Sequence, residues 1–167
     1  FLYLAHHAPH TPIEAKPDDV AHFQAKLRPG LNHRNPVYAA MVKNLDENVG
    51  RVLDHLRTRR LEEKTIVIFA SDNGGVGGYA REGIKKGGGD VTDNAPLRSG
   101  KGSLYEGGTR VPFIVRWPGV TPAGTFTDTP TIHVDLYPTL MEIASASAPE
   151  NQPLDGESLV PLFRDSK

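Results

Sequence analysis

The segment Thr65–Ala70 constrains the fold of this chain more than any other feature. It reads Thr-Ile-Val-Ile-Phe-Ala, an uninterrupted run of apolar and β-branched residues that is typical of a strand buried on both faces. Before it, apolar residues recur at helical spacing up to about Arg60, after an Asn35-Pro36 start that supplies an N-cap and a proline at the first helical position. A helix that leads into a buried strand is half of a βαβ unit, so we expect an α/β fold.

The other segments are consistent with that fold class. We predict further strands over Phe1–Ala5 and Val111–Trp117 and a second helix over His133–Ala146, with Asp135 as its cap. Residues 13–34 contain the breaker Pro17 and lack a clear period, so they are interpreted as an irregular surface excursion. The tail from residue 149 is interpreted as loop-like, with a short apolar turn over 159–163. Because the first five residues already have the composition of a buried strand, we expect the chain to begin inside a fold and residues 1–167 to form one domain.

Composition and charge exclude several classes of function. Lys and Arg number 19 against 20 Asp and Glu, so the formal net charge is -1 and no block of one sign suggests a nucleic-acid partner. No apolar run approaches the roughly 20 residues that cross a bilayer, so we expect no membrane partner. Cysteine is absent, which excludes a disulfide framework, a Cys-based zinc site and a cysteine nucleophile within this stretch.

The clearest candidate for a metal site is the turn Ser71-Asp-Asn-Gly-Gly75, which directly follows the buried strand. Asp72 and Asn73 there offer a carboxylate and an amide oxygen, the hard ligands that Ca²⁺ and Mg²⁺ prefer, at the strand end where ligands bind in α/β sheets. The alternative is that both residues only build a tight turn, as Asp-Asn-Gly often does.

A second candidate is Lys101, which lies between two glycines in a segment that continues to Pro112. Such glycines allow the backbone to approach an anion closely, and a lysine there can act as a point charge on phosphate or sulfate. The alternative is a flexible basic loop; the spacing is not that of a P-loop. For Glu106 and Arg110 in the same segment we predict a structural ion pair rather than catalysis.

Three histidines, His6, His7 and His10, follow the predicted opening strand, on a loop whose two prolines prevent a continuing strand or helix. Ligands for zinc are not evident elsewhere, so proton donation or contact with an anion is favoured over a zinc site. Ordinary surface histidines are the alternative.

Five segments occur in one order along the chain: residues 7–12 (His-Ala-Pro-His-Thr-Pro), the helical stretch 49–54, the turn 71–75, the segment 98–112 and the stretch 135–139. In this order they resemble the type I, formylglycine-dependent sulfatases of the alkaline phosphatase superfamily. The resemblance implies a partial alkaline-phosphatase-like sandwich, with a central, mainly parallel sheet flanked by helices. It also implies that the chain is the C-terminal part of a sulfatase catalytic domain.

The resemblance further implies roles for four residues. Asp72 and Asn73 would be ligands of Ca²⁺, with Mg²⁺ as the alternative cation. Lys101 would contact the sulfate, and His10 the sulfate or the departing oxygen, so these two are the expected catalytic and substrate-binding residues. The complete protein would then hydrolyse sulfate esters, with a sulfated carbohydrate as a candidate substrate.

The sequence also departs from the family pattern. The Cys-or-Ser-x-Pro-x-Arg segment that yields the formylglycine nucleophile is absent, as is the early aspartate pair of the calcium site. We expect both upstream, in a missing N-terminal half of the domain, and expect the chain alone to be inactive. A phosphodiesterase or phosphonate hydrolase of the same superfamily, and a non-catalytic sulfated-glycan-binding remnant, are the alternative functions.

Substrate choice and compartment are less constrained. The only segment that is a candidate for selecting a sugar is the glycine-rich excursion 74–96. The family resemblance implies a periplasmic, secreted or lysosomal location, and the chain bears no signal of its own.

Overall fold

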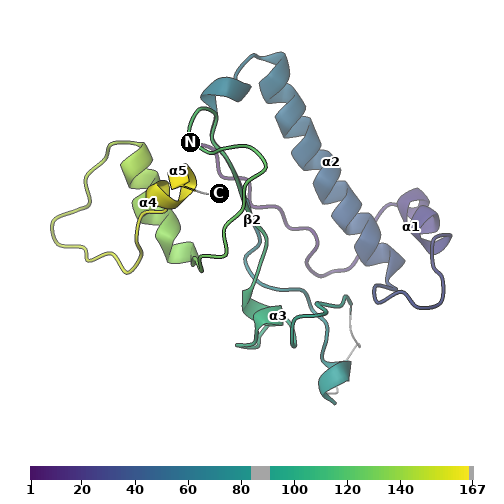
Figure 1. Cartoon of the computed structure of the whole chain (residues 1–167). Helices are drawn as coiled ribbons and strands as arrows, with labels where there is room; N and C mark the ends of the chain where they lie inside the picture. The colour runs from purple at the N-terminus through teal and green to yellow at the C-terminus, as the bar shows by residue number, and fades with distance from the viewer. Residues whose placement is uncertain (84–90, 166–167) are drawn as a thin grey trace. The chain divides into compact units, whose positions relative to one another are not determined.

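A computed structural model describes residues 1–83 and 91–165 (Figure 1). Its longest helix and its two strands follow the sequence pattern closely. Helix α2 spans Pro36–Thr58, and strands β1 (Val67–Ala70) and β2 (Phe113–Arg116) pair in a two-stranded sheet. The described residues therefore form an α/β arrangement, which confirms the fold class at this level of detail. The triple-glycine run at 87–89 lies outside the described residues.

The chain forms two compact units. The first comprises Phe1–Leu61 and Phe69–Phe113, and the second comprises Glu62–Ile68 and the chain from Ile114 onward. The boundaries of the short elements complete the description: in the first unit α1 (Pro17–Gln24), η2 (Ala80–Glu82) and α3 (Glu106–Thr109), and in the second η1 (Glu62–Lys64), η3 (His133–Asp135), α4 (Leu136–Ile143) and α5 (Val160–Asp165). No helix in the described ranges is both long and apolar enough to cross a bilayer.

Helix α2 begins where its sequence predicts. The side chain of Asn35 accepts a hydrogen bond from the Tyr38 N–H at 3.0 Å, and Pro36 occupies the first turn, where a missing N–H costs nothing. The helix ends at Thr58, two residues before the predicted end, and Ala40 and Met41 are its buried residues. The amphipathic pattern and the cap together fix this element.

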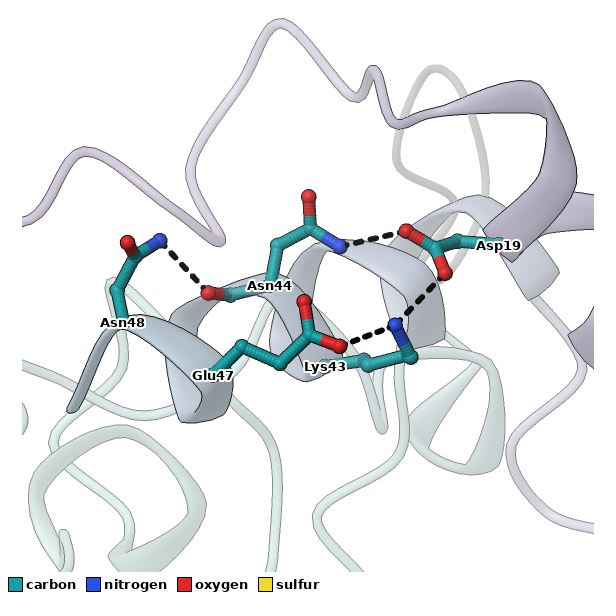
Figure 2. Close-up of polar contacts among 5 residues, drawn as sticks. All are labelled: Asp19, Lys43, Asn44, Glu47 and Asn48. Carbon is teal, nitrogen blue, oxygen red and sulfur yellow. Dashed lines mark hydrogen bonds and ion pairs between the residues drawn. The ribbon is translucent and has the colours of Figure 1, made fainter. Parts of the chain in front are cut away.

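Helix α1 was not predicted, because residues 13–34 were interpreted as irregular. Pro17, taken as a breaker, is instead its first residue, and the helix buries no side chain of its own. Figure 2 shows what holds it on α2: Asp19 of α1 accepts hydrogen bonds from Lys43 Nζ at 2.8 Å and from Asn44 Nδ2 at 2.9 Å. Because this helix depends on tertiary polar contacts, its own sequence carries little signal.

The same cluster is ordered along α2 itself. Lys43 also pairs with Glu47 one turn later at 2.5 Å, and the Asn48 side chain donates to the Asn44 carbonyl at 2.8 Å (Figure 2). The hydrogen bonds from Lys43 and then from Asn44 hold the pKa of the Asp19 carboxyl below its usual value. The carboxylate is thus stabilised in its charged form by the fold.

The predicted opening strand is a correction. Residues Phe1–Ala5 form no strand, and Phe1, Leu2 and Tyr3 are 103%, 74% and 80% exposed. A strand needs a neighbour to receive its backbone hydrogen bonds, and none of the described residues pairs with this segment. The composition of residues 1–5 favours a strand, but no strand forms because no partner strand is present among the described residues.

In the second unit, the predicted helix over 133–146 is divided into η3 and α4. Asp135 does not cap α4 with its side chain; its carboxylate accepts from the N–H groups of Ile132 at 2.9 Å and Glu157 at 3.0 Å instead. Thr139, with 0% exposure, accepts from the Leu159 N–H at 2.8 Å and donates to the Asp135 carbonyl. The stretch 135–139 therefore anchors the chain that leads into α5.

Helix α5 occupies part of the tail that was predicted to be loop-like. Leu159, Val160 and Phe163 are buried and form the apolar core of the second unit. The predicted short apolar turn at 159–163 was thus the start of a helix.

We predict that α1 loosens at acid pH. The pKa of Asp19 lies below its unfolded value, so its stabilising contribution is complete above the usual aspartate pKa of about 3.9 and is lost as the pH falls through the lowered folded value. Amide hydrogen exchange of residues 17–24, measured from neutral pH down to pH ~3, should show this loss. Asp19→Asn should abolish the pH step, whereas Asp18→Asn, on the exposed side of the same helix, should leave it unchanged.

We also predict that Thr139→Val destabilises the second unit by about 1–3 kcal/mol, because the buried Leu159 N–H loses its acceptor. Urea unfolding followed by tail-specific hydrogen exchange would measure this cost. Thr139→Ser keeps the hydroxyl and loses only a methyl group, so it should cost less; a larger loss for serine would contradict the role given to the hydrogen bond.

Candidate functional site

The first unit brings two of the predicted motifs together. We call residues 71–78 the aspartate turn and residues 97–110 the lysine loop. The Gly74 N–H donates to the Gly108 carbonyl at 3.0 Å, and the Lys101 N–H donates to the Gly75 carbonyl at 3.0 Å. The metal-ligand candidates and the anion-binding lysine thus lie on two loops that are joined directly through their backbones.

Glycines make that junction possible. A Cβ atom on Gly74 would lie 1.8 Å from the Gly107 carbonyl oxygen, and one on Gly100 would lie 2.3 Å from the Gly77 and 2.5 Å from the Gly75 carbonyl oxygens. No side chain fits at such distances. The glycine before Lys101 thus admits the neighbouring backbone, and the predicted approach of an anion to this segment stays a prediction.

The aspartate turn leaves its two candidate ligands available. The Ser71 hydroxyl donates to the Asn73 carbonyl at 3.0 Å and the Ser71 N–H donates to the Pro112 carbonyl at 3.2 Å, so the backbone of the turn is fixed on both sides. The Asp72 carboxylate is exposed and, within the described ranges, makes no hydrogen bond or ion pair. Neither of the two side chains that would bind a cation is hydrogen-bonded to another residue that the structure describes.

Lys101 is held by its backbone in the same way. Its N–H is bound to Gly75, and its carbonyl accepts from the hydroxyl of Tyr79, a residue that is only 2% exposed. The following residue, Gly102, has a φ of +85°, in the left-handed region that favours glycine. The backbone of Lys101 is therefore fixed while its amine is not paired with any described carboxylate.

The other cations of the lysine loop are occupied. Arg98 pairs with Glu82 at 3.7 Å, and its guanidinium lies 3.7 Å from the ring centroid of Tyr105. Arg110 pairs with Glu106 at 3.7 Å, which confirms the predicted ion pair. Lys101 is thus the residue of this loop whose charge remains available to an anion.

The histidines lie on a separate loop. His7 and His10 approach edge to face, with ring centroids 5.7 Å apart, and each places a ring nitrogen 3.0 Å from the Thr11 carbonyl. For His10 the nitrogen is Nδ1, so donation to Thr11 leaves Nε2 to carry or accept a proton. No hydrogen bond or ion pair among the described residues links His10 to Lys101 or to the aspartate turn.

The metal site can be tested by its donors. Carboxylate and amide oxygens are the donors that Ca²⁺ and Mg²⁺ take, so Asp72 and Asn73 fit the expected cation in kind. In number they fall short of the six to eight oxygens of a calcium shell, and the described residues hold no cluster of three or more His, Asp or Glu suited to a metal.

The sequence did not single out two side chains that contact these loops: Tyr79, whose hydroxyl donates to the lysine loop, and Asn94, which contacts both loops. Tyr79 carries a weak signal, as a large residue among glycines. Asn94 lies beside Ala95-Pro96 and is typical of a turn, and a turn residue does not reveal its tertiary partners.

Known proteins similar to this chain share one family. The family model described as Sulfatase matches residues 1–146. A sulfatase from Formosa agariphila is 39% identical over 176 residues, which cover 99% of this chain and 30% of the relative. Human steryl-sulfatase is 39% identical over 127 residues, covering 76% of this chain and 21% of its own length.

A solved structure is similar over almost the whole of this chain. The crystal structure of Ps i-CgsB superimposes with a TM-score of 0.81 at 39% identity, covering 98% of this chain and 33% of that one. The protein has also been solved in complex with k-i-k-neocarrahexaose, where the TM-score is 0.77. The chain therefore spans about a third or less of the length of these proteins.

The junction of the two loops predicts a sharp response to one added methyl group. Gly74→Ala should destabilise the first unit by about 1–3 kcal/mol, because the new Cβ would collide with the Gly107 carbonyl oxygen. Gly50→Ala is the matched control: a Cβ there meets nothing within 4 Å, and replacing a mid-helix glycine should stabilise by about 0.5–1 kcal/mol. Thermal unfolding of both variants would measure these two changes in stability, which should have opposite signs.

Proposed function

The chain belongs to the sulfatase family, and from this premise we propose that its full-length protein is a sulfuric ester hydrolase that uses a divalent cation, Ca²⁺ in the first place. One observation carries the proposal: Lys101, whose amine pairs with no carboxylate among the described residues, is hydrogen-bonded through its N–H to the turn that presents Asp72 and Asn73. A cation and a lysine held at a fixed distance from each other can each contact oxygens of the same sulfate group.

Asp72 and Asn73 would bind the cation through a carboxylate and an amide oxygen. The cation, when bound, supplies a Lewis acid that draws charge from the sulfuryl oxygens. The exposed Asp72 side chain would not have to break a hydrogen bond to any described residue before it binds the cation. The hydrogen bonds of Ser71 hold the turn in place. The rest of the shell would come from outside the described residues or from water.

Lys101 would neutralise a second sulfate oxygen as the S–O bond to the leaving group breaks. Because its backbone is fixed at both N–H and carbonyl, little conformational entropy is lost beyond that of its own side chain. His10 would contact the sulfate or donate the Nε2 proton to the departing alkoxide, with Nδ1 held on the Thr11 carbonyl. Electrostatic stabilisation of the transition state would be the main source of catalysis.

The nucleophile would be a formylglycine derived from a Cys-or-Ser-x-Pro-x-Arg segment, which residues 1–167 do not contain. We accordingly propose that this chain alone does not turn over sulfate esters and that residues 1–167 are part of one catalytic domain. In that domain, β1 and β2 would belong to a larger, mainly parallel sheet of the alkaline-phosphatase-like type.

For the substrate we propose a sulfated carbohydrate. The support is the likeness to Ps i-CgsB, which has been solved in complex with k-i-k-neocarrahexaose and is 38% identical to this chain in that structure. The relatives from Formosa agariphila and human are both named sulfatases, so phosphodiester hydrolysis is not favoured. A periplasmic, secreted or lysosomal location remains part of the proposal and rests on the family alone.

The test is hydrolysis by the full-length protein. We expect Ca²⁺-dependent release of sulfate from 4-nitrophenyl sulfate and from sulfated oligosaccharides. Lys101→Ala should lower kcat/KM by about 10²–10³, as loss of one oxyanion-stabilising donor does. Lys64→Ala, an exposed lysine of the second unit, is the control and should change little.

Two outcomes would overturn this function. One is a metal-loaded, formylglycine-bearing protein that leaves every aryl and sugar sulfate intact. The other is faster cleavage of bis(4-nitrophenyl) phosphate than of any sulfate ester. Binding of sulfated glycans without hydrolysis would favour the non-catalytic remnant.

A further inference from the structure

The side chain of Asn94 makes the densest set of contacts between the two loops. Its Oδ1 accepts from the Gly75 N–H at 3.2 Å, while its Nδ2 donates to the Gly75 carbonyl at 2.9 Å. The same Nδ2 also donates to the Gly77 carbonyl at 3.2 Å and to the Ser99 carbonyl at 3.0 Å. One amide thus contacts both the aspartate turn and the lysine loop.

The chemistry of these contacts specifies an asparagine. Three carbonyl oxygens converge on the NH₂ group and one N–H points at the oxygen, so both halves of an amide are required. A carboxylate would place negative charge against three carbonyl oxygens, and an aliphatic side chain would leave the Gly75 N–H without its acceptor.

The space around the amide is equally restrictive. A Cβ on Gly100 would lie 2.8 Å from Asn94 Nδ2, and one on Gly75 would lie 3.0 Å from Asn94 Oδ1. The amide therefore lies against bare backbone on both sides, where a longer side chain such as glutamine finds no room. Ser99, one of its partners, is 2% exposed and adopts a left-handed φ of 61°. An uncommon backbone conformation of this kind persists when surrounding contacts hold it.

The contacts also place Asn94 close in sequence to each functional candidate. Gly75 lies two residues after Asn73, and Ser99 lies two residues before Lys101. Gly75 is the shared point, because its carbonyl also accepts from the Lys101 N–H. A change at Asn94 is transmitted to both loops through one peptide group.

We propose that Asn94 is a positioning residue, which sets the spacing between the cation ligands Asp72 and Asn73 and the sulfate-binding Lys101. The proposal rests on the proposed function of that site. Asn94 itself contacts neither cation nor sulfate in this arrangement; it acts through the backbone of Gly75 and Ser99. Residues that orient metal ligands in this way typically contribute 10–100-fold to metal affinity or activity.

The decisive experiment measures cation binding rather than catalysis. In the full-length protein, Asn94→Ala should raise the Ca²⁺ dissociation constant, determined by calorimetry, by about 10–100-fold. Amide exchange should accelerate in residues 72–78 and 97–102 and stay unchanged in α2. Asn94→Asp should shift the dissociation constant at least as far, because it keeps the size of the side chain and removes its donors.

Asn44→Ala is the matched control. Asn44 is also a half-buried asparagine that joins two segments, since it donates to Asp19 of α1, and within the described residues it makes no hydrogen bond to either loop. Its loss should accelerate exchange in α1 and leave the Ca²⁺ dissociation constant within twofold of the wild-type value. A purely structural role for Asn94 would make the two variants alike.

Each outcome decides the proposal. Unchanged Ca²⁺ affinity and unchanged exchange in Asn94→Ala would overturn it, as would accelerated exchange throughout α2, or a wild-type protein that binds no Ca²⁺. If the wild-type protein binds Ca²⁺ but hydrolyses no sulfate ester, a selective loss of affinity in Asn94→Ala still supports positioning, and only the proposed reaction fails. In an active protein, Asn94→Ala and Lys101→Ala should lower kcat/KM by less together than the product of their separate effects.

Discussion

The contact between the aspartate turn and the lysine loop depends on an absence of side chains. Gly74 faces Gly107, and Gly100 faces Gly75 and Gly77, at distances where a single Cβ would collide with a carbonyl oxygen. Backbone groups from two loops can then hydrogen-bond to each other as directly as neighbouring strands do. The spacing between Asp72 and Lys101 is consequently set by peptide groups, whose geometry varies less than that of side chains.

Most of the charged side chains on the same loops form ion pairs. Arg98 and Arg110 are paired with Glu82 and Glu106, whereas Lys101 and Asp72 have no such partner in the part of the chain that the structure describes. An ion pair between Lys101 and Asp72 would stabilise the empty site and would have to break before a cation and a sulfate could bind. Holding the two residues by their backbones avoids that competition.

The sequence predicted those features that depend on the residues of a single continuous segment. Helix α2 has an apolar period and an asparagine cap, β1 has a β-branched run, and both occur within two residues of their predicted positions. Helix α1 was missed because its stability comes from Asp19 binding residues more than 20 positions away. The strand predicted over Phe1–Ala5 failed for a related reason: strand propensity is local, but a strand forms only against a partner.

For the candidate site the same distinction holds. The types of Asp72, Asn73 and Lys101 were sufficient to propose a cation and an anion, and their roles stay predictions, as does that of His10. The contact between their loops was not evident from the sequence, because a glycine indicates that another group can approach closely but does not identify that group. Asn94 was invisible for this reason, since its four contacts all go to backbone atoms of residues that have no distinguishing chemistry.

Charge balance sets a final condition on the proposed site. A divalent cation with Asp72 as its one carboxylate, together with Lys101 and the single negative charge of a sulfate ester, would leave the site with a net positive charge of about one before the other ligands are counted. A hard cation also needs several more oxygens than Asp72 and Asn73 provide. Further carboxylates would meet both needs at once, so the proposed chemistry requires that acidic ligands from beyond the described residues complete the shell. The neutral side chain of Asn73 and the amine of Lys101, which has no carboxylate partner among the described residues, fit a site of that kind. Most of its negative charge would come from those additional acidic ligands.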